Sequence, residues 1–205
     1  YADDAGMIWI GMGEGLDQFN PATGIFKHYR NDRKDLDSLS SGAHTIPVLR
    51  DRKGRLWVGT DNGLDRLDET TGKFIHHRNE PGNPKSLSSN IVWKIYEDRQ
   101  GVIWIATGDP WFNKNPDDGG LNRLNDDGTF TRYMHDPKDL HSLINNKVAA
   151  MYEDSRGVFW VGTGGDGLHT MDRTTGKFER QLFDPGNPEK LSRPPLWKGE
   201  DSNMV

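Results

Sequence analysis

The residues best suited to bind a ligand occur together in the stretch Gly108–Gly120, which reads GDPWFNKNPDDGG. Exposed aromatic side chains on a polar loop, such as Trp111 and Phe112, cost solvation free energy unless they pack or bind something. Their faces suit sugar rings. Side chains that could hydrogen-bond to hydroxyl groups follow in the same stretch: Asn113, Lys114, Asp117 and Asp118. The alternative is that the two aromatic side chains fold down as a lid or pack against a neighbouring part of the fold or another protein.

A second group of polar residues lies where loops meet the starts of expected strands. It consists of His44, Asn90, Asn145, Asn146 and Arg193. If these loop ends converge, the side chains would line the same ligand site. The alternative is ordinary turn chemistry, because Asn is common at such positions.

Metal-binding and catalytic motifs are weak in this sequence. Asn113, Asn115, Asp117 and Gly119 alternate somewhat like a calcium loop, but the glycine is displaced and Pro116 intervenes. The adjacent pair His76 and His77 would point to opposite faces of a strand. The sequence has neither a nucleophile elbow nor a phosphate loop. We therefore expect no catalytic residues, no bound metal and no cofactor.

Composition excludes several functional classes. The net charge of -5 provides no basic field for a nucleic-acid backbone, so nucleic acid is not an expected partner. There are no cysteines, which excludes disulfides and thiolate chemistry. No apolar run approaches the roughly 20 residues of a membrane span. The chain begins with Tyr1 rather than Met, so we expect a processed end or a cut inside a longer protein.

The elements that must position these residues repeat along the chain. A pattern of Asp, a turn ending in Gly, a short apolar strand and a tryptophan occurs four times, with tryptophans 48, 47 and 56 residues apart. The four are Trp9, Trp57, Trp104 and Trp160. A period of this length predicts a propeller or a solenoid. We interpret these tryptophans as core residues, and the recurring aspartates Asp3, Asp51, Asp98 and Asp154 as turn residues.

Each repeat divides into four expected strands. In one unit they are Ile91–Glu97, Val102–Ile105, Leu121–Asn125 and Phe130–Tyr133, with a turn at Asp98–Gly101. The second strand is apolar at successive positions, as in a strand that is buried on both faces. Pro47 falls in a first strand, which is acceptable if that strand has a free edge toward a channel. The sequence predicts an all-β fold, a β-propeller of four-stranded blades at about 1–45, 46–91, 92–147 and 148–205.

The chain starts and ends partway through a repeat unit. Tyr1–Asp3 aligns with the end of a first strand, and Leu196–Asp201 aligns with another first strand. The last strand could complete the opening blade of a closed four-bladed ring. We favour a piece of a larger ring instead. An open piece would expose two apolar blade faces.

The connections between second and third strands mark one face of the propeller. In three units the distance from the tryptophan to the next strand's leucine is seven or eight positions, but from Trp104 to Leu121 it is seventeen. The extra residues are those of Gly108–Gly120. Together with the long return loops, this connection is predicted to form the top face, where propeller ligands usually bind.

The same repeats carry a fuller pattern: Tyr152–Asp154, Gly157–Thr163, Gly167–Leu168, Thr175–Phe178 and the loop Asp136–Leu143. This pattern resembles the two-component regulator propeller repeat over essentially the whole chain. The resemblance implies a seven-bladed propeller, often two in tandem. Such propellers form the extracytoplasmic sensor of hybrid histidine kinases or related signalling proteins that detect polysaccharide breakdown products. The chain departs from that plan in having four repeats and no kinase, receiver, membrane span or immunoglobulin-like connector.

Three functions follow as expectations, since a fold does not fix a function. The first is an extracytoplasmic, periplasmic or cell-surface, sensor that binds an oligosaccharide or similar polar ligand and is not itself an enzyme. The second is an interaction scaffold that contacts the rest of a longer propeller or other chains, with a homodimer as one assembly. The third is a propeller-type lyase, for which His44 is a starting point without an identified partner.

Overall fold

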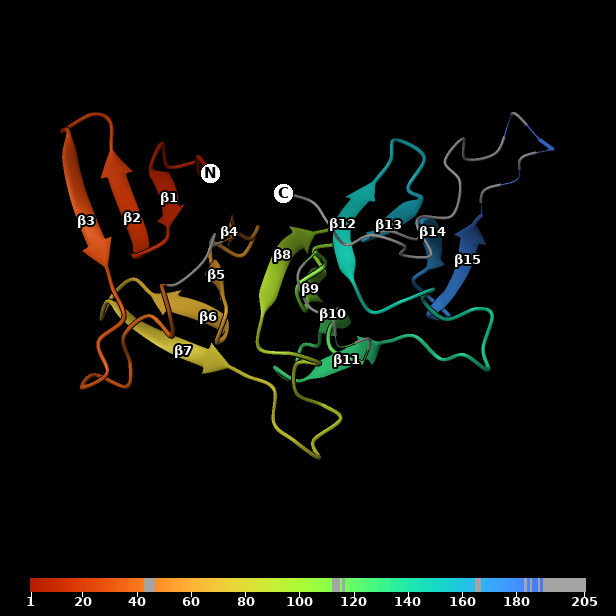
Figure 1. The fold of residues 1–205 in the computed structure, drawn as a ribbon. Helices are drawn as coiled ribbons and strands as arrows, with labels where there is room; N and C mark the ends of the chain where they lie inside the picture. The colour runs from red at the N-terminus through yellow and green to blue at the C-terminus, as the bar shows by residue number, and fades with distance from the viewer. Residues whose placement is uncertain are drawn as a thin grey trace, which may run out of the picture.

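The fold contains only β-strands among the residues described. The structure is a computed structural model that describes residues 1–42, 47–111, 115, 117–164, 167–182, 184, 186, 187 and 189. Within these residues fifteen strands form four antiparallel sheets. The sheets follow one another around an arc in chain order, from β1–β3 at the left of Figure 1 to β12–β15 at the right. This all-β arrangement of repeated sheets confirms the predicted fold class.

Each sheet is one repeat, and its strands pair in chain order. The first sheet has three strands: β1 (Ile8–Met12), β2 (Gly15–Asn20) and β3 (Ile25–Tyr29). The second comprises β4 (Val48–Arg50), β5 (Leu56–Thr60), β6 (Gly63–Asp68) and β7 (Lys73–His77). The third comprises β8 (Val92–Glu97), β9 (Ile103–Thr107), β10 (Gly120–Leu124) and β11 (Phe130–Tyr133). The fourth comprises β12 (Val148–Glu153), β13 (Phe159–Thr163), β14 (Gly167–Asp172) and β15 (Lys177–Gln181).

The strand boundaries agree with the sequence-based prediction to within two residues. At the N-terminus, Ala2 forms an isolated bridge with Ile8, as expected for the end of a first strand. Pro47 lies one residue before β4, and its carbonyl accepts a hydrogen bond from the Gly59 amide at 2.8 Å. The strand predicted at Leu196–Asp201 lies outside the described residues. The division into blades at the predicted boundaries and the closure of a ring remain predictions.

The repeated aspartate and tryptophan of each sheet are joined by a hydrogen bond. The indole N–H donates to the carboxylate at 2.8 Å in Trp9–Asp3 and Trp57–Asp51, 2.9 Å in Trp104–Asp98 and 3.1 Å in Trp160–Asp154. Burial would raise the pKa of Asp3 and Asp51, but the indole and backbone donors, with Arg50 or Arg55, outweigh it and lower both. The aspartate therefore makes the turn and also fixes the core tryptophan.

Each tryptophan packs toward the sheet that follows it. Trp9 belongs to a core cluster with Leu56 and Val58 of the second sheet, and Trp57 clusters with residues of the third. Trp104 clusters with Phe159 and Val161 of the fourth. These three indoles are 1–2 % exposed, whereas Trp160 of the fourth sheet is half-buried. The tryptophans are core residues, as predicted, and hold successive sheets together.

Candidate functional site

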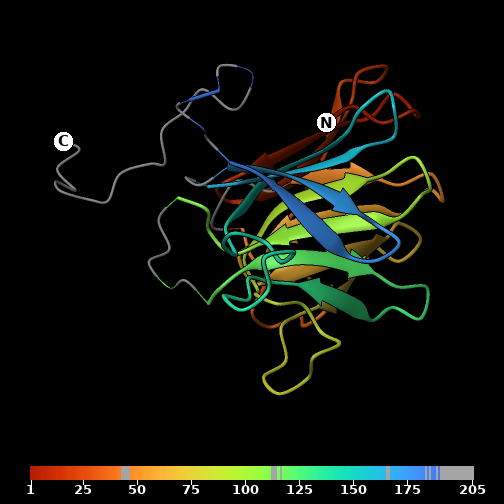
Figure 2. The ribbon, with the colours of Figure 1, turned by 90° about the vertical axis from the view of Figure 1, so that its right-hand side faces the viewer.

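The predicted ligand face lies at one end of the sheets. Because the strands are antiparallel, the connections between second and third strands lie at the end opposite the Asp–Gly turns. In Figure 2 the described residues at both ends of the connection between β9 and β10 lie on that side of the sheets, away from the hairpin turns at the other.

Close contacts of the backbone fix the two ends of this connection. Gly119 has φ of 103°, and a Cβ there would lie 2.6 Å from the carbonyl oxygens of Thr107 and Asn146. A Cβ on Gly164 of the fourth sheet would lie 2.5 Å from the Pro110 carbonyl oxygen. Only glycine fits such approaches. The connection is therefore packed against the fourth sheet.

Trp111 stands at the tip of the described part of this connection. Its side chain is 61 % exposed, and its backbone N–H donates to Asp109 Oδ1 at 2.8 Å. Of the other predicted residues, Asp117 is exposed and Asp118 half-buried, and the Asp117 amide donates to Asn115 Oδ1 at 3.1 Å. Phe112, Asn113 and Lys114 lie outside the described residues. An aromatic side chain and a carboxylate are thus presented to solvent by one connection.

Asn90 and Asn145 make turn contacts. Asn90 accepts the Asn79 amide through Oδ1 at 2.7 Å, and its carbonyl accepts the Gly63 amide at 2.7 Å. Asn145 Oδ1 accepts the Lys147 amide at 2.8 Å. These are the contacts expected of the turn-chemistry alternative, and both side chains are half-buried.

The remaining predicted positions add one more loop contact. Asn146 accepts the His135 amide through Oδ1 at 2.7 Å, as Asn90 does for Asn79. His44 and Arg193 lie outside the described residues. The structure therefore places Trp111, Asp117 and Asp118 on one connection, with Asn145 and Asn146 in the return loop beside it.

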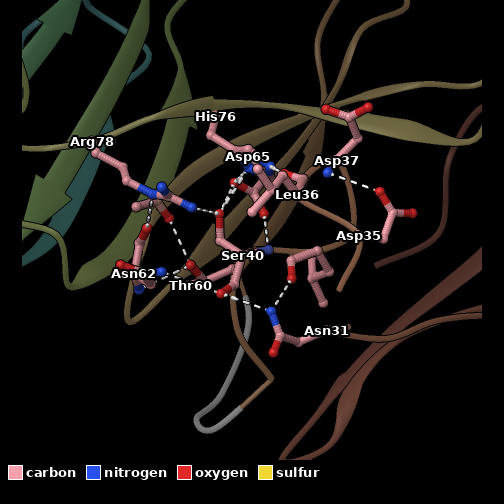
Figure 3. A network of polar contacts seen from close by, with 12 residues as sticks. Asn31, Asp35, Leu36, Asp37, Ser40, Thr60, Asn62, Asp65, His76 and Arg78 are labelled. Atoms are coloured by element: carbon pink, nitrogen blue, oxygen red, sulfur yellow. Dashed lines mark hydrogen bonds and ion pairs between the residues drawn. The ribbon is translucent and has the colours of Figure 1, made fainter. Parts of the chain in front are cut away.

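A Ser–His–Asp cluster anchors the return loop of the first sheet to the second (Figure 3). Ser40 Oγ donates to Asp65 Oδ1 at 2.6 Å and lies 2.8 Å from His76 Nδ1, which is itself 2.7 Å from Asp65 Oδ1. His76 Nε2 contacts the Leu36 carbonyl at 2.8 Å. In a nucleophilic triad the serine and the carboxylate contact different ring nitrogens. Here they share one, so the cluster is a loop anchor.

The contacts of this anchor shift the pKa of His76, and similar anchors recur in the next sheets. The hydrogen bond to Asp65 raises the pKa of His76, against the opposing effect of burial. The amides of Ser40, Ser88 and Ile144 donate to the third-strand residues Asp65, Asn122 and His169 at 2.7, 2.9 and 3.1 Å. Each return loop is thus held by the sheet that follows it.

The described residues contain no candidate for a membrane-spanning helix or for a metal-binding cluster. The described residues form strands and no helix, so no helix among them could span a bilayer. Nor does the described part of the chain gather three His, Asp or Glu side chains where they could hold a metal. His44, the starting point of the lyase interpretation, is not within that part.

Sequence reasoning missed one aromatic residue on the inner strand of the third sheet. Trp93 lies at a register irregularity of β8, between Val92 and Lys94, and is half-buried. β4, β8 and β12 lie on the inside of the arc in Figure 1, so Trp93 belongs to the strand nearest its centre. A bulge interrupts the alternation of inward and outward side chains along a strand. The alternation in the sequence therefore did not single out Trp93.

Comparison with known proteins supports the repeat. The sequence profile of the two component regulator propeller matches residues 45–62, 86–109 and 142–165. No curated protein sequence matches the chain.

Solved structures show the fold. The extracellular domain of a proposed hybrid two component system from B. thetaiotaomicron superposes with a TM-score of 0.58 at 21% identity, covering 87% of this chain and 29% of that one. Virginiamycin B lyase from Staphylococcus aureus gives 0.58 at 16% identity, covering 90% and 55%. PorZ, a surface component of the type-IX secretion system of Porphyromonas gingivalis, gives 0.57 at 15% identity, covering 86% and 26%. The chain thus spans between about a quarter and just over half of these relatives.

Proposed function

We propose that this chain, in which residues 45–62, 86–109 and 142–165 match the two component regulator propeller, is the ligand-binding part of an extracytoplasmic sensor. The ligand is an oligosaccharide or a similar polar molecule, bound on the face that carries the connection between β9 and β10. The extracellular hybrid two component system domain supports the sensor role by its fold. No residue of this segment acts catalytically in this proposal.

The observation that carries the proposal is the contrast between Trp111 and the repeat tryptophans. Trp9, Trp57 and Trp104 are 1–2 % exposed and bonded to aspartates, whereas Trp111 is 61 % exposed on a connection that is longer than its counterparts in the other sheets. Tryptophan buries more apolar area than most side chains when it is covered. A sugar ring stacked on this indole would cover it, with Asp117 within the same connection for hydroxyl groups.

The uncovered face of the first sheet, at the start of the arc, favours a longer propeller. The phenylalanine within the first two residues of each sheet's outermost strand is 4 %, 4 % and 2 % exposed at Phe74, Phe130 and Phe178, but 48 % exposed at Phe26 of the first sheet. At the three buried positions a preceding sheet covers the ring. A further repeat packed on the first sheet would do the same for Phe26, and we include such repeats in the proposed sensor.

Signalling would follow from differential binding. A ligand can shift a conformational equilibrium only by the difference in its affinities for the two states. A ligand that contacts both the connection at Trp111 and the return loop at Asn145 would favour one packing of the third and fourth sheets. That bias is what the rest of a sensor would read.

A protein-interaction scaffold is the second candidate. The exposure of Trp111 also fits a contact with another chain, because tryptophan is enriched at interface hot spots. The fold shared with PorZ, a bacterial surface component, supports this alternative, in which a homodimer is one assembly. A lyase is the third candidate, and the fold shared with virginiamycin B lyase supports it through shape alone.

The test is binding of a panel of neutral oligosaccharides of defined length, measured by isothermal titration calorimetry. Trp111→Ala should weaken binding by about 5- to 150-fold, since aromatic stacking on a bound ring contributes about 1–3 kcal/mol. Trp111→Phe should retain part of the affinity. Leu36→Ala is the matched control, because Leu36 is 84 % exposed and lies in the return loop of the first sheet.

Two results would contradict this function. Equal affinity in wild type and Trp111→Ala would remove the indole from the site. Failure of the whole panel to bind, together with dimerisation that Trp111→Ala abolishes, would favour the scaffold instead.

A further inference from the structure

A concave region lies between the second and third sheets and extends from the Asp–Gly turns as far as His77, the last residue of β7. It has a volume of about 830 Å³ and is bounded by the Asp–Gly turns and by the hairpin turn of the third sheet at residues 125–128. Trp57, Arg66 and His77 line it from the second sheet, and Glu97 lines it from the third. The three sheet-to-sheet interfaces are built from the same repeat, so this one can be compared with its two neighbours position by position.

In the interface between the first and second sheets, one arginine joins carboxylates of both. Arg50 donates through Nε to Asp3 Oδ2 at 2.9 Å and through Nη1 to Glu69 Oε1 at 2.5 Å. Asp3 is the turn aspartate of the first sheet, and its side chain is fully buried. The Arg50 guanidinium thus fills the space between the two turns.

In the interface between the third and fourth sheets an arginine again joins carboxylates of both sheets, but the positions of the arginine and of one carboxylate are exchanged. Arg173 stands at the position of Glu69, and Glu153 at the position of Arg50. Arg173 donates to Asp98 Oδ2 at 2.8 Å and to Glu153 Oε1 at 2.9 Å. Both carboxylate side chains are 0–3 % exposed, so the guanidinium again fills the space between the turns.

The interface between the second and third sheets has lost this bridge. The two equivalent positions are both acidic, Glu97 and Asp126. The turn aspartate Asp51 is instead bonded by Arg55 of its own sheet, Nε to Oδ2 at 2.6 Å. Within the described residues, no arginine joins carboxylates of these two sheets, and the concave region occupies the corresponding place.

A second substitution enlarges the same region. The last residue of the fourth strand is Tyr29 in the first sheet and Tyr133 in the third, where each ring packs on the following sheet's phenylalanine at 5.7 and 6.1 Å. In the second sheet it is the smaller His77, 5.7 Å from Phe130. The Nε2 atom of His77 is buried and has no hydrogen-bond partner in the described structure. Burial, followed by the charge of Arg66, lowers the pKa of His77, so its ring is neutral near pH 7.

Arg66 supplies an uncompensated positive charge. It pairs in register with Trp57, so both side chains leave the same face of the sheet, the one that packs on the third sheet. The side chain is half-buried, and among the described residues its guanidinium has neither a hydrogen bond nor an ion pair. A partly buried charge without a partner is costly. The first sheet carries the neutral Gln18 at this position.

The remaining charges favour an anion over a cation. Five basic and three acidic residues line the region in a chain of net charge -5. Two of the acidic groups already have donors. Glu97 accepts the Arg52 amide at 3.1 Å, and Asp127 accepts the Thr129 hydroxyl at 2.6 Å. The guanidinium of Arg66 has no partner among the described residues, and the buried Nε2 of His77 lacks one as well.

We propose that this region, the cleft between β5–β7 and β8–β11, binds a small carboxylate or phosphate anion through Arg66, with His77 as a second hydrogen-bonding partner. A guanidinium matches the planar oxygen pairs of both anions. The cleft is separate from the face of Trp111, so this site stands or falls independently of the proposed sensor ligand.

The test is titration of the 205-residue chain with citrate and with inorganic phosphate, each in a chloride buffer of constant ionic strength, by isothermal titration calorimetry. Arg66→Gln should lower the affinity for the bound anion by at least about tenfold, because a charge-assisted hydrogen bond is lost. The change should not unfold the chain, since Gln18 occupies the equivalent position of the first sheet. Arg156→Gln is the control for charge, because Arg156 is 74% exposed in the fourth sheet.

A second variant keeps the test decisive if Arg66→Gln fails to fold. His77→Tyr places in the second sheet the residue that the first and third sheets carry, which fills the cleft, and should also abolish binding. Binding of neither anion at millimolar concentrations by the wild type would overturn the site, as would equal affinity in Arg66→Gln and the wild type. Citrate binding without phosphate binding identifies a carboxylate site, and the reverse identifies a phosphate site.

Discussion

Two interfaces built from the same repeat differ in what fills them. Between the third and fourth sheets, Arg173 joins Asp98 and Glu153, and the space between the turns is closed. Between the second and third sheets, Glu97 and Asp126 face the same space without a bridging arginine, and a cleft of about 830 Å³ remains. The repeat therefore conserves the packing of apolar strands, while the charged positions around it decide whether an interface is closed or open to a ligand.

In the two closed interfaces the bridging arginine comes from different elements of the sheet. Arg50 comes from a first strand and Arg173 from a hairpin turn, yet each reaches the turn aspartate of the preceding sheet at 2.9 or 2.8 Å. What is maintained is the compensation of a buried carboxylate. Where Arg55 takes over that task within its own sheet, no guanidinium joins carboxylates of the second and third sheets among the described residues, and Arg52 links them through the Glu97 carboxylate and the Arg99 carbonyl instead.

The largest effect is expected from removing the bridge of the closed interface. Arg173→Gln leaves the carboxylates of Asp98 and Glu153 buried without their guanidinium, which should lower the free energy of unfolding by about 3–5 kcal/mol. Chemical denaturation followed by tryptophan fluorescence measures the change. Arg156→Gln, whose side chain is 74% exposed, should shift it by less than about 0.5 kcal/mol. Similar losses in the two variants would show that the bridge does not hold the interface.

Acid should weaken the same interface through Glu153. Burial would raise the pKa of Glu153, but the hydrogen bonds from Arg173 and the Arg99 amide outweigh it and the pKa is lowered. A carboxyl with a lowered folded pKa stabilises fully above its unfolded pKa of about 4.3, and this contribution is lost as pH falls through the folded value.

Unfolding measured from about pH 6 to pH 2 should therefore show a loss of stability below about pH 4 that is smaller in Glu153→Gln, although this variant is less stable at neutral pH. Equal slopes in the two proteins would contradict the assignment. Asp3 and Asp51, whose pKa values are also lowered, contribute a residual slope to both.

A smaller gain in stability is expected from closing the open interface. Asp126 stands at the position of Arg173, and Glu97 already stands at that of Glu153, so Asp126→Arg recreates the bridge of the fourth sheet in the third. We expect the free energy of unfolding to rise by about 0.5–2 kcal/mol, as for other cavity-filling changes, and anion binding to disappear. A variant that binds citrate or phosphate as the wild type does would show that the missing arginine did not create the cleft.

The fold was largely predictable from the sequence, because its signal is local and repeated. Each strand lies within a few residues of an Asp–Gly turn or a tryptophan, and the period of about 48 residues orders the sheets. The hydrogen bond from the indole to the turn aspartate, such as Trp104–Asp98, joins residues six positions apart in every sheet. That bond was not anticipated, although the invariant spacing of the two residues was visible.

The arginine bridges between successive sheets could not be predicted from the sequence. Arg50 and Asp3 are 47 residues apart, and Arg173 and Asp98 are 75 apart, so their pairing depends on how the sheets are stacked. The exchange of charge between the two closed interfaces hides the relation further, because the equivalent positions carry opposite residues. The candidate ligand connection, in contrast, stands out in the sequence by its length, and Trp111 on it is exposed, while its role as a ligand site remains a prediction.

The central claim is that the face of Trp111 recognises a polar ligand while the repeat tryptophans serve packing. It is tested most directly by following the indole N–H signals of the ¹⁵N-labelled chain during titration with the oligosaccharide panel, with Trp111→Phe used to assign the Trp111 signal. We predict that the Trp111 signal shifts with saturation, while those of Trp9, Trp57 and Trp104, bonded to their aspartates, stay in place. A panel that leaves the Trp111 signal unmoved, or that moves the signals of the repeat tryptophans instead, would contradict the claim.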